Sequence, residues 1–298
     1  MLNNYKDFID RYGYCVVRKV FSEDEVIELR RLFKSIEKKS LKKKHAITIS
    51  KAERNGFKPK DDQTLILGDV VSFKEFSKFE LLVYNEKILK PVRKVIGDKI
   101  CYFGESNMQS GTGDRGFHKD NRISDRENPN GEDWVGEFPL IRVAIYLNDT
   151  VKYSGGVKVV PGSHKIPTSH FKSGFIIVGS EIGDIVIWKF TTTHSGNFKR
   201  IKYFKNLTLH PRIEDYIPNW LEIDNPNRRR GIFITYGVEG NHLKNHINYL
   251  RTREDYLRYF KFAGTSEFSI KLAKEKGVKI IRPIENYGES LNSSGFND

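Results

Sequence analysis

Cysteine is scarce in this sequence. Cys15 and Cys101 are its only two cysteines among 298 residues, and they do not form a CxxC pair. Disulfide frameworks and thiolate metal sites need several cysteines at short, regular spacings. We therefore exclude both kinds of site and expect two buried thiols that pack as small hydrophobic side chains.

Long apolar runs are also missing. No stretch approaches the roughly 18 consecutive apolar residues of a membrane span, and Met1–Asp7 lacks the apolar centre of a secretion signal. The sequence therefore predicts a cytoplasmic protein without a membrane span. The 20 Phe and 14 Tyr, with a hydrophobic fraction of 38%, indicate a folded chain rather than a disordered one.

Acidic residues are outnumbered, because 51 Lys and Arg against 38 Asp and Glu give a formal charge of +13. The excess is concentrated in Lys38–Lys51, Lys199–Lys205 and Arg228–Arg230. A basic surface raises the local concentration of anions. No zinc-finger, helix-turn-helix or RNA-binding motif accompanies the charge. We therefore expect a small anionic or carrier-bound substrate, with nucleic acid as the alternative partner.

The pair His118 and Asp120 is the first candidate for a functional site. Residues two apart on a strand point to the same side, so this H-x-D spacing presents an imidazole and a carboxylate together. His194, in the run Thr191–Asn197, offers a third ligand. Two histidines and one carboxylate suit non-heme Fe(II) oxygenases, because they leave coordination positions open on the metal. An H-x-D pair or a single histidine is, by itself, common by chance.

Two further motifs lie between Asp120 and His194. Gly155-Gly156 leads through a short apolar run into Pro161-Gly162-Ser163-His164, and Gly183-Asp184 opens a second apolar run. With these pieces in this order, residues 116–236 resemble the phytanoyl-CoA dioxygenase family of Fe(II)- and 2-oxoglutarate-dependent oxygenases. No single motif is specific for that family, but the combination is.

The resemblance implies a reaction and a metal site. His118, Asp120 and His194 would bind Fe(II) and form the catalytic centre, with 2-oxoglutarate and O2 as cosubstrates. Relatives that halogenate have a small residue in place of the carboxylate, so Asp120 favours hydroxylation with release of succinate and CO2. In the family the Pro-Gly-Ser-His turn is structural, so His164 is left out of the metal site.

Two arginines are candidates for binding the distal carboxylate of 2-oxoglutarate. In the family, an arginine that opens the strand after the distal histidine pairs both oxygens of the distal carboxylate. Arg229 fits by strand register, although 34 residues separate it from His194 where the family has a short gap. Arg200 lies nearer and is the rival, and a merely exposed basic run is the third interpretation. Gln109 and Asn107 are further candidates for binding 2-oxoglutarate, or ordinary strand residues.

Local patterns predict the helices and strands. Ser22 and Glu25 form a capping box before an apolar stripe, so a helix begins there. Residues 42–62 are expected to form a long loop, and residues 199–227 an insertion that folds over the mouth of a barrel. The other predicted helices are 86–96, broken or kinked at Pro91, 250–262 and 268–276, and the predicted strands are 14–17, 100–109, 140–147, 156–160, 184–190 and 231–236.

Short strands without βαβ alternation predict a mainly β fold with flanking helices. The resemblance specifies a double-stranded β-helix, which is a cupin-like jelly roll. We expect a single domain over residues 1–298, with a mostly helical part at 1–99, the jelly-roll core at 100–237 and a C-terminal helical part at 238–298. Two alternatives to a small-molecule hydroxylase stay open, namely the same chemistry on nucleic acid or protein, and a non-enzymatic cupin-type binding module.

Overall fold

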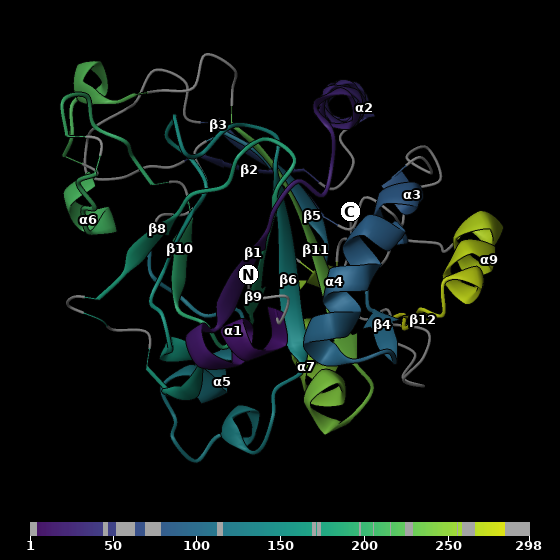
Figure 1. Ribbon diagram of the computed structural model, residues 1–298. Coiled ribbons are helices and arrows are strands. Elements are labelled where there is room, and N and C mark those ends of the chain that lie inside the picture. The colour runs from purple at the N-terminus through teal and green to yellow at the C-terminus, as the bar shows by residue number, and fades with distance from the viewer. Residues whose placement is uncertain are drawn as a thin grey trace.

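The computed structural model contains two β-sheets with helices around them. It describes residues 5–43, 47–51, 63–68, 79–111, 116–168, 171, 174–196, 198–204, 206–214, 216–223, 229–254, 256–257 and 266–283. One sheet has nine strands and the other has three. Figure 1 shows the small sheet on one side of the large sheet and most helices on the other. The predicted mainly β fold with flanking helices is confirmed.

The large sheet is antiparallel apart from the pairing of β12 with β4. Its main path runs β1-β9-β6-β11-β5-β3-β2, and β4 joins it beside β11. Residues 103–106 interrupt the predicted strand 100–109; the other strand predictions are confirmed to within two residues. The strands are β1 (Tyr14–Val17), β2 (Ile47–Lys51), β3 (Gln63–Gly68), β4 (Ile100–Tyr102), β5 (Asn107–Ser110), β6 (Leu140–Tyr146), β9 (Ile185–Lys189), β11 (Arg230–Val238) and β12 (Lys279–Ile280).

The first hundred residues contribute to both edges of this sheet. β1 forms one end of the path and pairs with β9, whereas β2 forms the other end and pairs with β3. β2 lies within the stretch expected to be a long loop, so that prediction is wrong at 47–51, and residues 52–62 lie outside the described residues. The sheet therefore extends beyond the core predicted at 100–237.

The small sheet packs on one face of the large sheet. Its order is β10 (His194–Gly196), β7 (Val157–Val159) and β8 (Ile176–Val178). Val157 and Val159 are buried in one cluster with Tyr146, Trp188 and Phe233 of the large sheet. We call the side of the large sheet that carries these three aromatic residues the inner face. The two sheets enclose a shared core, as a jelly roll does.

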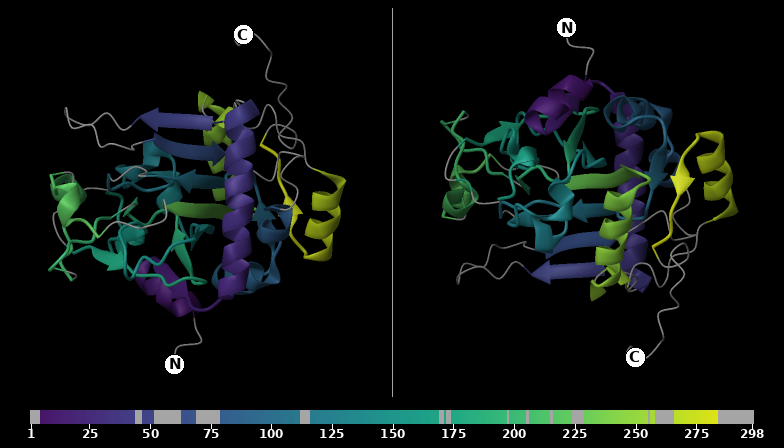
Figure 2. Two further views of the ribbon diagram at one scale, coloured as in Figure 1. Left: turned by 90° about the horizontal axis from the view of Figure 1, so that it is seen from above. Right: turned by 90° about the horizontal axis from the view of Figure 1, so that it is seen from below.

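Helices cover the opposite, outer face of the large sheet. Figure 2 shows α2 (Glu23–Lys43) running across the strands, with α3 (Glu80–Val83) and α4 (Glu86–Ile96) beside it, and α1 (Tyr5–Tyr12) contacts α4 and β1. The predicted capping box is present, since the N–H of Ser22 donates to Glu25 Oε2 at 2.8 Å and the N–H of Glu25 donates to Ser22 Oγ at 3.2 Å. α4 continues through the buried Pro91, so the predicted break is wrong.

Two helices follow the last long strand. α9 (Glu267–Glu275) confirms the prediction for 268–276. α7 (Asn241–Arg251) was not predicted, and its Leu243, Ile247 and Leu250 are buried against Phe103 and Phe190. The predicted helix 250–262 is wrong at its start, because α7 ends at Arg251 and residues 252–253 are not helical. Residues 255 and 258–262 lie outside the described residues. Among the described helices, none has the length and apolar character needed to cross a membrane.

Candidate metal centre

Two short backbone segments bring the three predicted metal ligands together. His118 and His194 form an antiparallel bridge in which the N–H of each donates to the carbonyl oxygen of the other at 2.9 Å. Two residues on, the N–H of Asp120 donates to the carbonyl oxygen of Phe190 at 2.8 Å. One ligand atom from each of His118, Asp120 and His194 lies within 4.8 Å of the others. The predicted triad is therefore assembled in space.

Backbone carbonyls orient both imidazole rings. His118 Nδ1 lies 2.9 Å from the carbonyl oxygen of Gly116, and His194 Nδ1 lies 3.0 Å from that of Thr192. A proton on each Nδ1 leaves the Nε2 lone pair free to bind a metal. These Nε2 atoms face Asp120, at 3.9 Å from Oδ1 and 3.7 Å from Oδ2 respectively. This donor set and its orientation fit a divalent transition metal.

The electrostatics favour the protonation states that a metal needs. Burial alone would raise the pKa of Asp120, but the Arg142 guanidinium and the two imidazoles hold it well below its usual range. Burial lowers the pKa of His194 to about 4, against the opposing effect of Asp120. At neutral pH the site therefore presents a carboxylate and a neutral imidazole, which are the metal-binding forms.

Lys119 lies between two of the ligands and points away from the metal site. It is fully buried, and its Nζ donates to the carbonyl oxygens of Ser163 at 2.7 Å and Thr191 at 2.5 Å. Burial lowers its pKa to about 7. Lys119 thus ties the H-x-D strand to the turn η4 (Ser163–Lys165). His164 of that turn lies 3.0 Å from the carbonyl oxygen of Asp10, outside the metal site as expected.

The two candidate arginines point to different places. Arg229 precedes β11 with the same parity as the inward-facing Phe233, and its Nη1 donates to the carbonyl oxygen of Gly111 at 3.2 Å. Gly155 leaves room for it, because a Cβ there would lie 3.3 Å from Arg229 Cδ. Arg200 instead donates through Nε and Nη2 to the carbonyl oxygen of Thr150, at 3.0 and 2.9 Å. Strand parity directs only Arg229 toward the inner face.

Three more polar side chains share this side of the sheet. Gln109 and Asn107 pair with Gly231 and Phe233 across β5 and β11, and both are half-buried where their neighbours in the strand are buried. Tyr146, which the sequence reading did not select, pairs with Gly231 from β6. Burial raises the pKa of Tyr146, and the positive charge of Arg229 opposes this effect. The available signal was that Tyr146 lies four residues after Arg142 in a strand whose odd positions are apolar, so both side chains share the opposite face.

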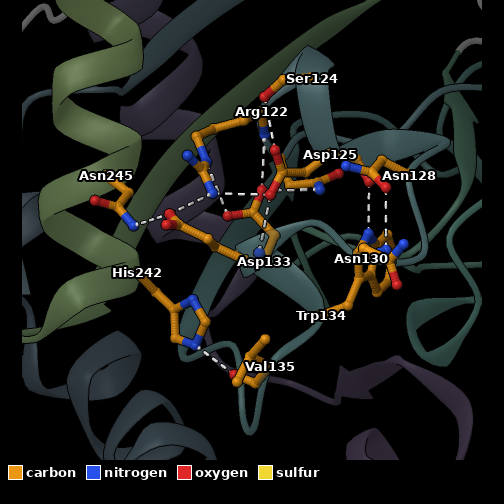
Figure 3. Close-up of polar contacts among 12 residues, drawn as sticks. Arg122, Ser124, Asp125, Asn128, Asn130, Asp133, Trp134, Val135, His242 and Asn245 are labelled. Carbon is orange, nitrogen blue, oxygen red and sulfur yellow. Dashed lines mark hydrogen bonds and ion pairs between the residues drawn. The ribbon is translucent and has the colours of Figure 1, made fainter.

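The loop that follows Asp120 is held by a buried ionic network, shown in Figure 3. It includes α5 (Ile123–Arg126) and η3 (Glu132–Trp134). Arg122 donates through Nε to Asp133 at 3.0 Å and through Nη2 to Asp125 at 2.8 Å. From α7, Asn245 donates to Glu132 at 2.6 Å. Sequence reasoning missed this network, which attaches α7 to the segment beside the metal site.

Among the described residues of the insertion 199–227, α6 (Pro211–Glu214) attaches to the outside of the small sheet. Lys158 of β7 points away from the shared core, and its Nζ lies 2.5 Å from Glu214 Oε1 of α6 with both side chains buried. Lys199 pairs with Glu222 at 3.3 Å, just before β11 returns to the large sheet. The pair of Lys158 with Glu214 attaches part of the insertion to the small sheet, whereas His210 within it packs against Phe117, the neighbour of His118, at 5.4 Å between ring centroids. The expectation that the insertion folds over the barrel mouth stays a prediction.

Comparisons with known proteins agree with this fold and site. The pattern of the phytanoyl-CoA dioxygenase (PhyH) family matches residues 9–198. An ectoine dioxygenase of Streptomyces coelicolor is 29% identical over 158 residues, which are 53% of this chain and 49% of that protein. The corresponding protein of Streptomyces avermitilis is 27% identical over 158 residues, 51% of this chain and 48% of that protein. The chain thus spans about half the length of the curated relatives it matches.

Solved structures share the fold at low identity. HygX from Streptomyces hygroscopicus, with nickel and 2-oxoglutarate bound, aligns with a TM-score of 0.51 and 16% identity over 80% of this chain and 87% of HygX. EctD from S. alaskensis, with 2-oxoglutarate and 5-hydroxyectoine, gives 0.51 and 16% over 80% of this chain and 76% of EctD. The match over residues 9–198, which contain all three predicted metal ligands, places the chain in the phytanoyl-CoA dioxygenase family.

Proposed function

We propose that this chain is an Fe(II)- and 2-oxoglutarate-dependent oxygenase that hydroxylates a small anionic or carrier-bound substrate in the cytoplasm. The observation that carries the proposal is the convergence of His118, Asp120 and His194, with ligand atoms within 4.8 Å of one another. Family membership supports the reaction class, and the basic composition of the chain supports an anionic substrate.

Bound at these residues, iron and 2-oxoglutarate supply the oxidising chemistry: one oxygen atom of O2 enters a substrate C–H bond and the other enters succinate, with loss of CO2. The chain provides the ligands in their binding forms. Its two imidazoles and one carboxylate leave the remaining coordination positions to cosubstrates. Trp188 and Phe233, both buried, line the inner face and exclude water from it.

The inner face also offers groups for the carboxylates of 2-oxoglutarate. Arg229 is our choice for the distal carboxylate, since a guanidinium pairs two oxygens at once. The amides of Gln109 and Asn107 and the hydroxyl of Tyr146 stand on the same face and offer hydrogen bonds. In this arrangement Arg229 fixes one end of the cosubstrate while the metal site fixes the other.

Metal binding and 2-oxoglutarate turnover test the proposal together. In His118→Ala and Asp120→Ala we expect loss of tight Fe(II) binding and of succinate formation, because each variant lacks one of the three ligands. His242→Ala is the matched control, since His242 lies on α7 with its Nε2 2.9 Å from the carbonyl oxygen of Val135. If the double variant of His118 and Asp120 binds Fe(II) and forms succinate like the wild type, the proposal is wrong.

The same assay separates the substrate classes. Anionic small molecules, polynucleotides and peptides are added in turn to the Fe(II)-loaded protein, and succinate formation is compared with the rate without substrate. A small anionic compound that stimulates turnover supports the proposed class. Stimulation by polynucleotide or peptide alone would move the activity to a macromolecular substrate, and metal binding without any turnover of 2-oxoglutarate would indicate a cupin-type binding module.

A further inference from the structure

We propose that Arg142 is a positioning residue for the metal-binding carboxylate and that it couples this carboxylate to helix α7. The inference rests on the proposed role of Asp120 as a metal ligand. Arg142 lies on the inner face of β6, and its charged end is placed between Asp120 on one side and Glu105 on the other, at 3.3 and 3.4 Å. It is 8% exposed, so its charge depends on these partners.

One hydrogen bond and one positive charge converge on a single oxygen of Asp120. Trp188 Nε1 donates to Oδ2 at 3.1 Å, and Arg142 Nε lies 3.3 Å from the same atom. Arg142 and Trp188 are direct cross-strand partners on β6 and β9, so the sheet register fixes their spacing. The two oxygens of Asp120 lie at similar distances from the imidazoles, 3.9 Å from Oδ1 to His118 and 3.7 Å from Oδ2 to His194. Trp188 and Arg142 both approach Oδ2, and this distinguishes it from Oδ1.

A carboxylate that is held through one oxygen presents the other as a single ligand. Because Oδ2 accepts from Trp188 and is paired with the charge of Arg142, Oδ1 is the oxygen left for the metal, and the carboxylate does not take up two coordination positions. The arrangement keeps room for the cosubstrates. Arg142 therefore acts on the metal through Asp120 in the proposed site.

The far side of Arg142 leads to the C-terminal helices. Glu105 accepts a hydrogen bond from Arg142 Nη2 at 3.4 Å and from the hydroxyl of Tyr256 at 3.0 Å. Its other oxygen lies 2.8 Å from Nε2 of His246, a fully buried residue of α7. A buried carboxylate needs such partners to offset its loss of hydration. The position of α7 thus sets the position of Glu105, and through it that of Arg142.

Phe190 provides a second, apolar connection along the same route. Its carbonyl oxygen accepts the N–H of Asp120 at 2.8 Å. Its ring lies 5.2 Å from the Arg142 guanidinium and 5.2 Å from the ring of His246. The family match ends at residue 198, so His246 lies beyond it. The structure assigns α7 a part in the metal site that the family pattern does not contain.

Cobalt binding tests this inference without turnover. Co(II) is titrated into the metal-free full-length protein, and both the dissociation constant and the visible absorption bands are recorded. Arg142→Lys keeps the charge but loses the guanidinium that reaches both carboxylates, and Trp188→Phe removes the indole N–H together with the smaller ring that carries it. Since partners of a metal ligand typically contribute 10–100-fold in affinity, we expect Arg142→Lys to weaken Co(II) binding by about 10-fold or more and to shift the bands.

A double variant tests the connection to α7. We expect His246→Gln to weaken Co(II) binding in the same direction, and Arg142→Lys with His246→Gln to be no weaker than Arg142→Lys alone, because both act on one path. The control is Arg251→Lys, also on α7, whose side chain binds the carbonyl of Pro283 instead. It should leave the dissociation constant and the bands unchanged.

Different results would overturn the positioning role of Arg142, its connection to α7, and the proposed metal site itself. Folded Arg142→Lys and Trp188→Phe proteins with wild-type affinity and spectrum would overturn the positioning role while leaving the metal site intact. Additive losses from Arg142 and His246 would overturn the connection to α7. If the wild type does not bind Co(II), or if His118→Ala binds it equally well, the proposed metal site and this inference both fall.

Discussion

Side-chain alternation along one strand decides which arginine reaches the inside of the barrel. Arg230 points to the outer face, where its Nη2 lies 3.4 Å from Glu37 of α2. Arg229 has the opposite parity and points to the inner face with Gly231 and Phe233. The 34 residues between His194 and Arg229 include the insertion, after which the chain returns to the large sheet at β11.

Arg229→Ala should weaken 2-oxoglutarate while sparing the metal. If Arg229 pairs the distal carboxylate in a buried site, its truncation leaves that charge unpaired at a cost of roughly 2–5 kcal/mol. Calorimetric titration of 2-oxoglutarate into the Co(II)-loaded protein measures this loss, and a Co(II) titration measures the metal. Arg200→Ala is the matched control, because Arg200 binds the Thr150 carbonyl. Wild-type affinity in Arg229→Ala with a loss in Arg200→Ala would transfer the role to Arg200.

The metal triad was predictable from sequence because each ligand has its own local signal. The H-x-D spacing fixes a common side for His118 and Asp120, and the order of the surrounding motifs selects His194. The residues that hold the triad in place have no such signal. Arg142 and Glu105 meet across β11, where Thr235 is the register partner of Arg142 and its hydroxyl donates to the carbonyl oxygen of Glu105. No spacing in the sequence predicts that contact.

At the scale of elements, prediction succeeded where a pattern is local. The capping box before α2 and the alternation in β6 depend only on neighbouring residues. β2 was missed because the residues around it are polar and basic, although Ile47, Thr48 and Ile49 are β-branched residues that favour a strand. α7 carried a usable signal, since Leu243, Ile247 and Leu250 follow the i, i+4, i+7 spacing of a helix.

In the insertion, a basic residue that the sequence alone would place in solvent is buried in an ion pair. Lys199 is 6% exposed and pairs with Glu222, and Arg200 is bound to the Thr150 carbonyl. Of the three bases Lys199, Arg200 and Lys202, only Lys202 is exposed. We expected this run to attract an anionic substrate. Lys199 and Arg200 instead stabilise the insertion through buried or half-buried contacts. Of these three bases, Lys202 is the one whose charge is exposed to attract anions.

The pair of Lys158 and Glu214 should be the strongest attachment of α6 to the small sheet. Lys158→Met removes one partner of a buried pair, and an uncompensated charge of this kind costs about 3–5 kcal/mol in the free energy of unfolding. Urea unfolding measures the loss. The double variant Lys158→Met with Glu214→Leu should recover much of it, because no charge then stays buried. Equal stability of Lys158→Met and wild type would contradict this account.

At the scale of the whole molecule, metal binding should stabilise the fold. His118 and Asp120 precede β6 whereas His194 opens β10, so a metal joins segments that come from different parts of the chain. A ligand that binds only the folded state at 100 times its dissociation constant adds about 2.7 kcal/mol to the free energy of unfolding. Thermal unfolding with and without Co(II) should show a rise for wild type and none for Asp120→Ala. A rise in both would mean that the metal binds elsewhere.

The pairing of β1 with β9 has a consequence for the order in which the chain can fold. Tyr14 is the register partner of Trp188, which comes 174 positions later. During synthesis β1 has no strand to pair with until well over half of the chain has left the ribosome, and such long-range pairing closes slowly. Trp188 also holds the carboxylate of Asp120, so the metal site is completed only after the earliest and a much later strand have met. A ribosome-bound chain that ends shortly before β9 should therefore expose β1 to protease, whereas a chain released at full length should protect it.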